Sequence, residues 1–230
     1  MSTPALLDCV EIETAPNPTR AVIWIHGLGS DGHDFAPIVP GLDLKGVPAT
    51  RFVFPHGPVR PITVNNGMKM RAWYDIKVMD LVRQEDAAGI RESQGMIEAL
   101  IARENARGIP SEHIVLGGFS QGCAMALYTG LRHPRRLAGI VALSGYVVLP
   151  ADFASERAAV NAKTPVFLAH GVHDPVVPFA RAEHAHTLLQ GVGQPVEWHT
   201  YQIPHSVSPA ELADVAAFLR RTLGGPGAGG

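Results

Sequence analysis

The amino-acid sequence predicts an α/β fold in which helices cover both faces of a mostly parallel sheet. Short apolar runs without polar alternation recur along the chain, which is typical of strands buried on both faces. Amphipathic segments of helical length lie between these runs, and such alternation of strand and helix favours a parallel sheet. The 24 glycines and 19 prolines among 230 residues argue against a helical bundle.

The predicted strands are rich in β-branched and aromatic residues, as buried strands usually are. In chain order they cover residues 21–25, 51–54, 114–116, 137–143 and 166–168, and a last run covers 196–203. Each strand is followed by a loop at its carboxyl end, where α/β proteins carry their functional residues.

Two of the predicted helices have particularly clear signals. One places Ile90, Ile97, Leu100 and Ile101 on one face and ends before Gly108 and Pro110. The last helix is expected to begin at Ser208 as its N-cap, with Pro209 as its first residue and Glu211 completing a capping box.

The organisation of the chain predicts a single domain over residues 1–223, followed by a Gly-rich disordered tail over residues 224–230. No nucleic-acid partner is expected, because the chain has 19 basic and 21 acidic side chains and no stretch concentrates lysine or arginine. No apolar run is long enough for stable membrane insertion, and the N-terminus lacks the pattern of a signal peptide. Cys9 and Cys123 are too few for a disulfide framework, so a cytoplasmic location is expected.

A G-x-S-x-G motif formed by residues 118–122 lies between the strand over 114–116 and a predicted helix. This context is that of a nucleophile elbow, in which a sharp turn exposes the hydroxyl of Ser120. The alternative is an ordinary Gly-rich turn with a solvated serine.

A serine nucleophile needs a histidine base and an orienting carboxylate, in the chain order Ser, Asp, His. Asp174 follows the strand over 166–168 and His205 follows the run over 196–203, so we assign them these roles. His170 and His173 remain alternatives for the base, although both share a loop with Asp174.

The histidines could instead bind a metal, but their spacing does not favour it. The pairs His184/His186 and His170/His173 lack metalloprotease spacing and an obvious third ligand, so no metal is expected.

An oxyanion hole is expected from the backbone N–H groups of Leu28 and Gln121. The loop of Leu28 also matches the dinucleotide motif G-x-G-x-x-G through its glycines at 27, 29 and 32. Pro37 and Pro40 interrupt the helix that dinucleotide binding requires, and the strand over 51–54 does not end in an acidic residue. No cofactor is therefore expected.

The sequence resembles the acyl-protein thioesterase and bacterial carboxylesterase family of α/β-hydrolases, also called the phospholipase/carboxylesterase family, over residues 22–219. The resemblance is carried by the segments WIHGLGSDGHDF, FPHGPVRPITVNNGMKMRAWYDI, GGFSQGCAMAL and HGVHDPVVP, and by His205-Ser206. It implies an α/β-hydrolase fold, the triad Ser120, Asp174 and His205, and cofactor-free hydrolysis. The chain departs from the family pattern at Val172-His173, beside the expected catalytic aspartate.

We therefore expect a serine esterase that cleaves carboxylic esters or thioesters of short to medium acyl chains. The alternatives are an acyl-protein thioesterase or lysophospholipase and, from a different class, a non-catalytic ligand-binding hydrolase fold. Met68, Met70 and Trp73, in an irregular segment over residues 61–81, are predicted to contact the acyl chain, the alternative being that they fill the core. A homodimer formed through exposed apolar loops is compatible with the sequence.

Overall fold

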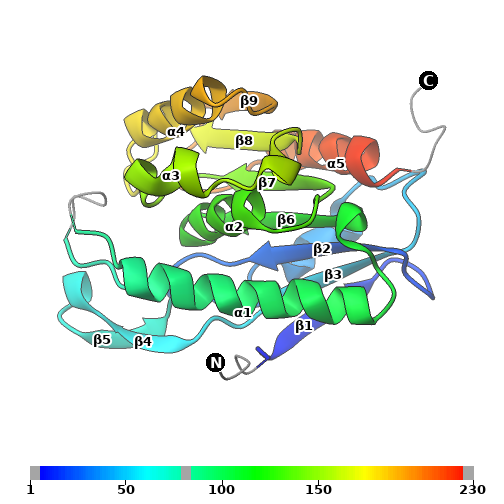
Figure 1. Cartoon of the computed structure of the whole chain (residues 1–230), viewed down its shortest axis with the longest axis horizontal. Helices are drawn as coiled ribbons and strands as arrows, with labels where there is room; N and C mark the ends of the chain where they lie inside the picture. The colour runs from blue at the N-terminus through cyan, green and yellow to red at the C-terminus, as the bar shows by residue number, and fades with distance from the viewer. Residues whose placement is uncertain (1–5, 79–83, 225–230) are drawn as a thin grey trace.

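The computed structural model describes residues 6–78 and 84–224, so the predicted tail beyond residue 224 lies outside the described residues. Its centre is a seven-stranded sheet with the strand order β1-β3-β2-β6-β7-β8-β9 (Figure 1). Every neighbouring pair is parallel except β1 and β3, which are antiparallel. The predicted mostly parallel α/β architecture is confirmed.

The elements follow one another in the alternation that the sequence indicates. The strands of the main sheet are β1 (Cys9–Glu13), β2 (Arg20–Ile25), β3 (Thr50–Pro55), β6 (Ile114–Phe119), β7 (Gly139–Leu143), β8 (Val166–Gly171) and β9 (Val196–Tyr201). The α-helices are α1 (Ala87–Ala106), α2 (Gln121–Arg132), α3 (Pro150–Glu156), α4 (Phe179–Gly191) and α5 (Pro209–Leu223). A separate hairpin pairs β4 (Val59–Ile62) with β5 (Met68–Arg71).

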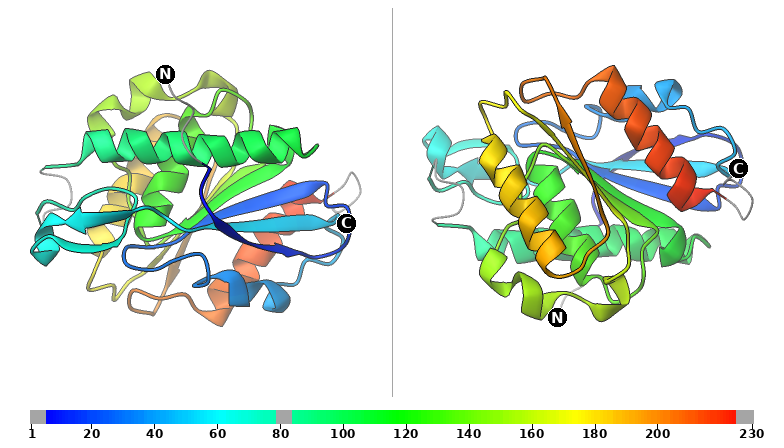
Figure 2. Two further views of the ribbon diagram at one scale, coloured as in Figure 1. Left: turned by 90° about the horizontal axis from the view of Figure 1, so that it is seen from below. Right: turned by 90° about the horizontal axis from the view of Figure 1, so that it is seen from above.

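Both faces of the sheet are buried, which explains the uninterrupted apolar runs. In β2, Ile23 and Ile25 pack into the core on the side of α1, α2 and α4, whereas Val22 and Trp24 pack into a second core with α5. Figure 2 shows α5 alone among the α-helices on its side of the sheet. Residues of alternating position along each strand therefore fill two separate layers.

Strand β1 and the hairpin β4–β5 are among the elements that were not predicted. Strand β1 is a half-exposed edge strand whose residues alternate between partly buried and exposed, so it lacks the apolar run of the inner strands. The hairpin β4–β5 overlaps the irregular segment over residues 61–81, and most of its residues are exposed or half-buried.

The register of the parallel strands brings their carboxyl ends to one edge. Ile25 at the end of β2 pairs with Gly118 near the end of β6, and Leu143 at the end of β7 pairs with both Phe119 and Ala169. The loops after β2, β6 and β8 consequently meet at this edge.

Candidate active site

Ser120 lies in the sharp turn between β6 and α2, where its backbone adopts φ 57° and ψ −119°. This is a left-handed φ that non-glycine residues rarely adopt, and it exposes the side chain at the carboxyl edge of the sheet. The flanking glycines make the turn feasible. A Cβ at Gly118 would overlap the backbone of Gly122, and a Cβ at Gly122 would overlap the Ile25 carbonyl.

A continuous chain of hydrogen bonds links Ser120 to a histidine and a buried carboxylate. The Ser120 hydroxyl donates to His205 Nε2 over 2.9 Å, and His205 Nδ1 donates to Asp174 Oδ2 over 2.6 Å. The other Asp174 oxygen accepts the backbone N–H groups of Val176 and Val177, each at 2.8 Å. Because one oxygen is held by the backbone, the other is fixed in the direction of the imidazole.

The other histidines considered for the base lie elsewhere. His170 is fully buried, and its Nε2 donates to the Val177 carbonyl over 2.9 Å, with Asp174 Oδ2 at 3.3 Å. His173 is exposed. Among the described residues, His205 is the histidine that is hydrogen-bonded to Ser120.

The predicted oxyanion donors, Leu28 and Gln121, line one pocket together with Ser120. Gln121 is the first residue of α2, so its N–H is one of those that a helix leaves without an internal partner. No described residue accepts a hydrogen bond from the N–H of Leu28 or Gln121. Both amides are therefore available to an oxygen atom beside Ser120, at the positive end of the α2 dipole.

The Gln121 side chain fixes its own backbone in place. Its Oε1 accepts the Trp73 backbone N–H at 2.7 Å, and its Nε2 donates to the Tyr74 carbonyl over 2.8 Å. The Trp73 indole N–H in turn donates to the His26 carbonyl over 2.9 Å, next to the loop that carries Leu28. The segment after β5 therefore connects the two expected oxyanion donors.

The predicted substrate contact by Trp73 is wrong for this structure. Its side chain is 0% exposed. It lies beneath the loop after β2, where its indole N–H donates to the His26 carbonyl. The alternative, that this residue fills the core, describes its position. Met68 is 64% exposed on the hairpin, and neither it nor Met70 lines the pocket beside Ser120.

His26 belongs to the same layer beneath the site and was not singled out from the sequence. Its Nδ1 donates to the Gly27 carbonyl over 2.7 Å, and its Nε2 accepts the Gly57 N–H at 2.9 Å, an arrangement that requires the neutral ring. Burial lowers the pKa of His26, which also favours the neutral form. A histidine directly at the end of a buried strand was the available signal.

Two recesses meet at Ser120. The smaller one, of about 80 Å³, is lined by Leu28, Ile76, Ser120, Gln121, Tyr146, Val176 and Val177. The larger one, of about 220 Å³, is lined by Gly27, Leu28, Ser30, Asp34, Phe119, Ser120, Val176 and His205. The smaller recess is the more apolar, and the larger one opens beside the imidazole.

Candidate metal ligands lie outside this hydrogen-bonded chain. Asp31 and His33 on the loop after β2 approach His56 after β3. The histidine pair His184 and His186, which was considered from the sequence and not expected to bind metal, lies on α4. None of the described helices is long and apolar enough to cross a membrane.

Comparison with known proteins identifies relatives along nearly the whole chain. A family model described as phospholipase/carboxylesterase matches residues 7–223. Acyl-protein thioesterase 1 of Gibberella zeae is 43% identical over 218 residues, which cover 91% of this chain and 93% of the relative. The protein of the same name from Neurospora crassa is also 43% identical, over 89% of this chain and 87% of its own length.

Solved structures agree with this relationship. The crystal structure of Arabidopsis thaliana SOBER1 superimposes with a TM-score of 0.83 at 30% identity and covers 89% of this chain and 99% of its own. That of esterase PE8 superimposes with a TM-score of 0.81 at 32% identity and covers 95% of this chain and all of its own (100%). The chain belongs to the phospholipase/carboxylesterase family of α/β-hydrolases and is a serine hydrolase.

Proposed function

We propose that the protein hydrolyses carboxylic esters and thioesters through a triad of Ser120, His205 and Asp174. The observation that carries this proposal is the unbroken hydrogen-bonded chain from Ser120 Oγ through both imidazole nitrogens to Asp174. His205 Nε2 accepts the hydroxyl proton as Oγ attacks the acyl carbon, and Asp174 stabilises the resulting imidazolium.

The tetrahedral intermediate places its negative oxygen at the Leu28 and Gln121 N–H groups. These two donors stabilise charge that develops only during the reaction. The imidazolium then protonates the departing alcohol or thiol, which leaves an ester between the acyl group and Ser120. Water, deprotonated by His205, attacks this ester and regenerates the free serine.

The two recesses at Ser120 suggest which group lies where. The apolar recess of about 80 Å³ accepts the acyl group, and the wider recess beside His205 accepts the leaving group. Pockets for drug-sized ligands are usually about 300–1,000 Å³, so the smaller recess favours short to medium acyl chains.

A second candidate, an acyl-protein thioesterase or lysophospholipase acting on long chains, is favoured by the name of the relatives. Both fungal relatives are called acyl-protein thioesterase 1. A long chain would extend beyond the small recess and across the hairpin β4–β5, which is where Met68 and Met70 lie.

The test is kcat/KM for acyl chains from acetyl to palmitoyl, each offered as an oxygen ester and as a thioester. We expect a maximum at short to medium chains, with a decline beyond them. A maximum at palmitoyl thioester would favour the second candidate. Ser120→Ala is the control and should lower kcat on the order of 10⁶-fold, since triad members act as a unit. More than a few per cent of residual activity in this variant would overturn the assignment of Ser120.

A further inference from the structure

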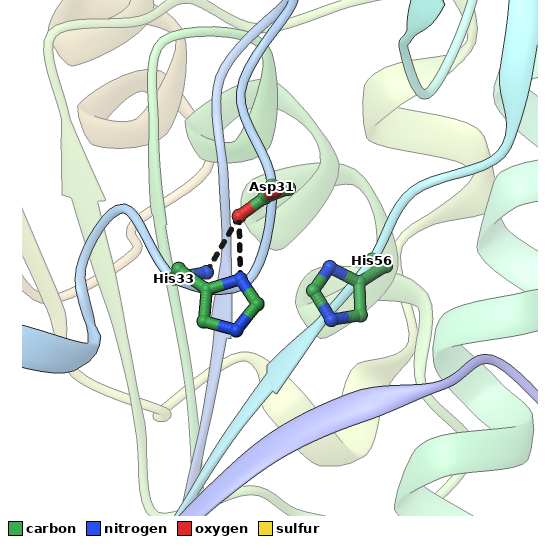
Figure 3. A group of neighbouring side chains, drawn as sticks. All are labelled: Asp31, His33 and His56. Carbon is green, nitrogen blue, oxygen red and sulfur yellow. Dashed lines mark hydrogen bonds and ion pairs between the residues drawn. The ribbon is translucent and has the colours of Figure 1, made fainter.

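We propose that Asp31, His33 and His56 form a binding site for a divalent transition metal ion of the zinc type. One ligand atom from each residue lies within 4.8 Å of the other two. Figure 3 shows the three side chains converging from two segments, the loop after β2 and the end of β3. A carboxylate with two imidazoles suits zinc, which binds nitrogen and oxygen ligands and often keeps one position for water.

The Asp31–His33 pair already has the spacing that zinc requires. Asp31 Oδ1 lies 3.1 Å from His33 Nδ1 and accepts the His33 backbone N–H at 2.8 Å. Ligands of a tetrahedral zinc ion, each at about 2.0–2.1 Å, lie about 3.3 Å from one another.

His56 is held beside this pair by the backbone of the same loop. Its Nδ1 accepts the Gly32 N–H at 3.1 Å, a bond that is given up when either ring nitrogen binds zinc, and its ring centre lies 5.2 Å from that of His33. Since β2 and β3 are parallel neighbours, the segments that follow them run side by side. The side chain of His33 is 72% exposed, so it can make the adjustment of about 1.5 Å that would bring all three ligands to zinc spacing.

This cluster is distinct among the titratable groups of the described chain. No other three such side chains within residues 6–78 and 84–224 have this spacing. The alternative explanation is a simple salt bridge between the exposed Asp31 and His33 side chains, which would contribute little to stability. Such a pair would not require His56 beside it. The convergence of His56 is the observation that points to a ligand.

The proposed metal site lies on the same loop as residues that line the active site. On the loop after β2, Leu28, Ser30 and Asp34 line the wide recess beside Ser120, whereas Asp31 and His33 are bonded to each other on the side of His56. A bound ion would therefore tie this loop to the end of β3. It would stabilise the loop that carries Leu28 without taking part in ester hydrolysis.

Isothermal titration of metal-free protein with ZnCl₂ tests this site directly. We expect one ion per chain, and Co²⁺ in its place should give the visible absorption of a low-symmetry site. His33→Ala and Asp31→Asn should each weaken zinc binding by about tenfold or more, since losing even an outer partner of a ligand costs about 10- to 100-fold. His184→Ala, a substitution of an exposed histidine on α4, is the matched control and should bind as the unmodified protein does.

The His205→Asn variant separates this site from the triad. Zinc binding should survive in His205→Asn and weaken in His33→Ala. The opposite pattern would place the ion on the triad and overturn the proposal, as would unchanged binding in His33→Ala and Asp31→Asn or no binding at all. Because binding is measured without substrate, none of these outcomes depends on the proposed hydrolysis.

Discussion

Trp73 lies beneath the active site with its indole N–H on the His26 carbonyl and its backbone N–H on Gln121. Through these bonds it contacts both segments that carry the oxyanion donors, although its side chain is fully buried. Its influence on catalysis should therefore arise from the position of Leu28 and Gln121 and not from contact with substrate.

Substitution of Trp73 by Phe removes the bond to His26 while retaining most of the buried ring. We expect kcat to fall about tenfold, because the two donors shift in position but are both retained. Removal of a whole oxyanion donor typically lowers kcat by about 10²- to 10³-fold. Kinetics with acetyl and octanoyl esters measure this, and the loss should be equal for both. A loss that grows with chain length would instead restore Trp73 as a substrate contact.

His205 and His173 offer a matched pair for the base. His205→Asn should lower kcat on the order of 10⁶-fold, because Ser120 loses its proton acceptor. His173→Asn should change kcat by less than a few-fold, since the exposed His173 side chain is adjacent to Asp174 only in sequence. Comparable losses in the two purified variants would show that the base has been misassigned.

At the scale of elements, helix α5 carries a buried carboxyl near its start. Ser208 caps the helix, its Oγ accepting the Glu211 N–H at 3.1 Å, which is the predicted half of the capping box. The Ser208 backbone N–H lies close enough to the Glu211 carboxyl to lower its pKa, but neither carboxyl oxygen completes a hydrogen bond with a described residue, so the reciprocal half is incomplete. Burial raises the pKa of Glu211 to about 7; the Ser208 amide opposes this rise and Asp214 adds to it.

The raised pKa of Glu211 predicts that the stability of the fold decreases as the pH rises. The folded state keeps a proton on Glu211 that the unfolded chain releases from pH 4.5 upwards, so stability falls between pH 4.5 and about 7. The decline amounts to about 3 kcal/mol at most. Glu211→Gln should lack it, so its free energy of unfolding relative to the unmodified protein should rise between pH 5 and pH 8.

Urea unfolding of both proteins at the two pH values measures this difference. Glu112→Gln, at an exposed position, is the control and should follow the unmodified protein. A constant difference between Glu211→Gln and the unmodified protein across the range would show that Glu211 is already ionised in the folded state.

We predict that long acyl chains extend from the small recess onto the hairpin β4–β5. Met70 packs near Gly29 on the loop that carries Leu28, and Met68 is exposed on the same strand. The joint substitution Met68→Ser and Met70→Ser should leave acetyl esters unaffected and lower kcat/KM for octanoyl esters by up to about 0.8 kcal/mol per methylene no longer buried. An equal loss for both esters, or a lower Tm with an unchanged chain-length profile, would assign the two methionines to the fold.

At the scale of the whole molecule, the sequence predicted what depends on local patterns. The inner strands were predictable because burial on two faces removes polar alternation, and Ser120 and Asp174 each follow such a strand. His205 follows the half-buried edge strand β9, and it was assigned from its place after Asp174 in the chain order that the motif requires. Strand β1 escaped prediction because its exposed edge position leaves no apolar run.

Contacts between distant segments could not be predicted in the same way. The bond between Trp73 and His26 joins residues 47 positions apart, so the sequence left open whether Trp73 fills the core or contacts substrate, and the family resemblance favoured the substrate contact. Likewise, His56 meets Asp31 and His33 only because β2 and β3 are parallel neighbours. Histidine spacing along the chain therefore pointed to no metal site, whereas the fold brings three ligands together.

Covalent labelling shows whether the fold activates Ser120 alone as a nucleophile. The protein is incubated with a phosphonylating reagent, and the adduct is located by intact-mass measurement and peptide mapping. We predict one adduct per chain, on the peptide containing Ser120, with esterase activity lost in proportion to labelling and no adduct in Ser120→Ala. Labelling at another residue, or full activity in a protein fully labelled at Ser120, would contradict the assignment of Ser120 as the nucleophile.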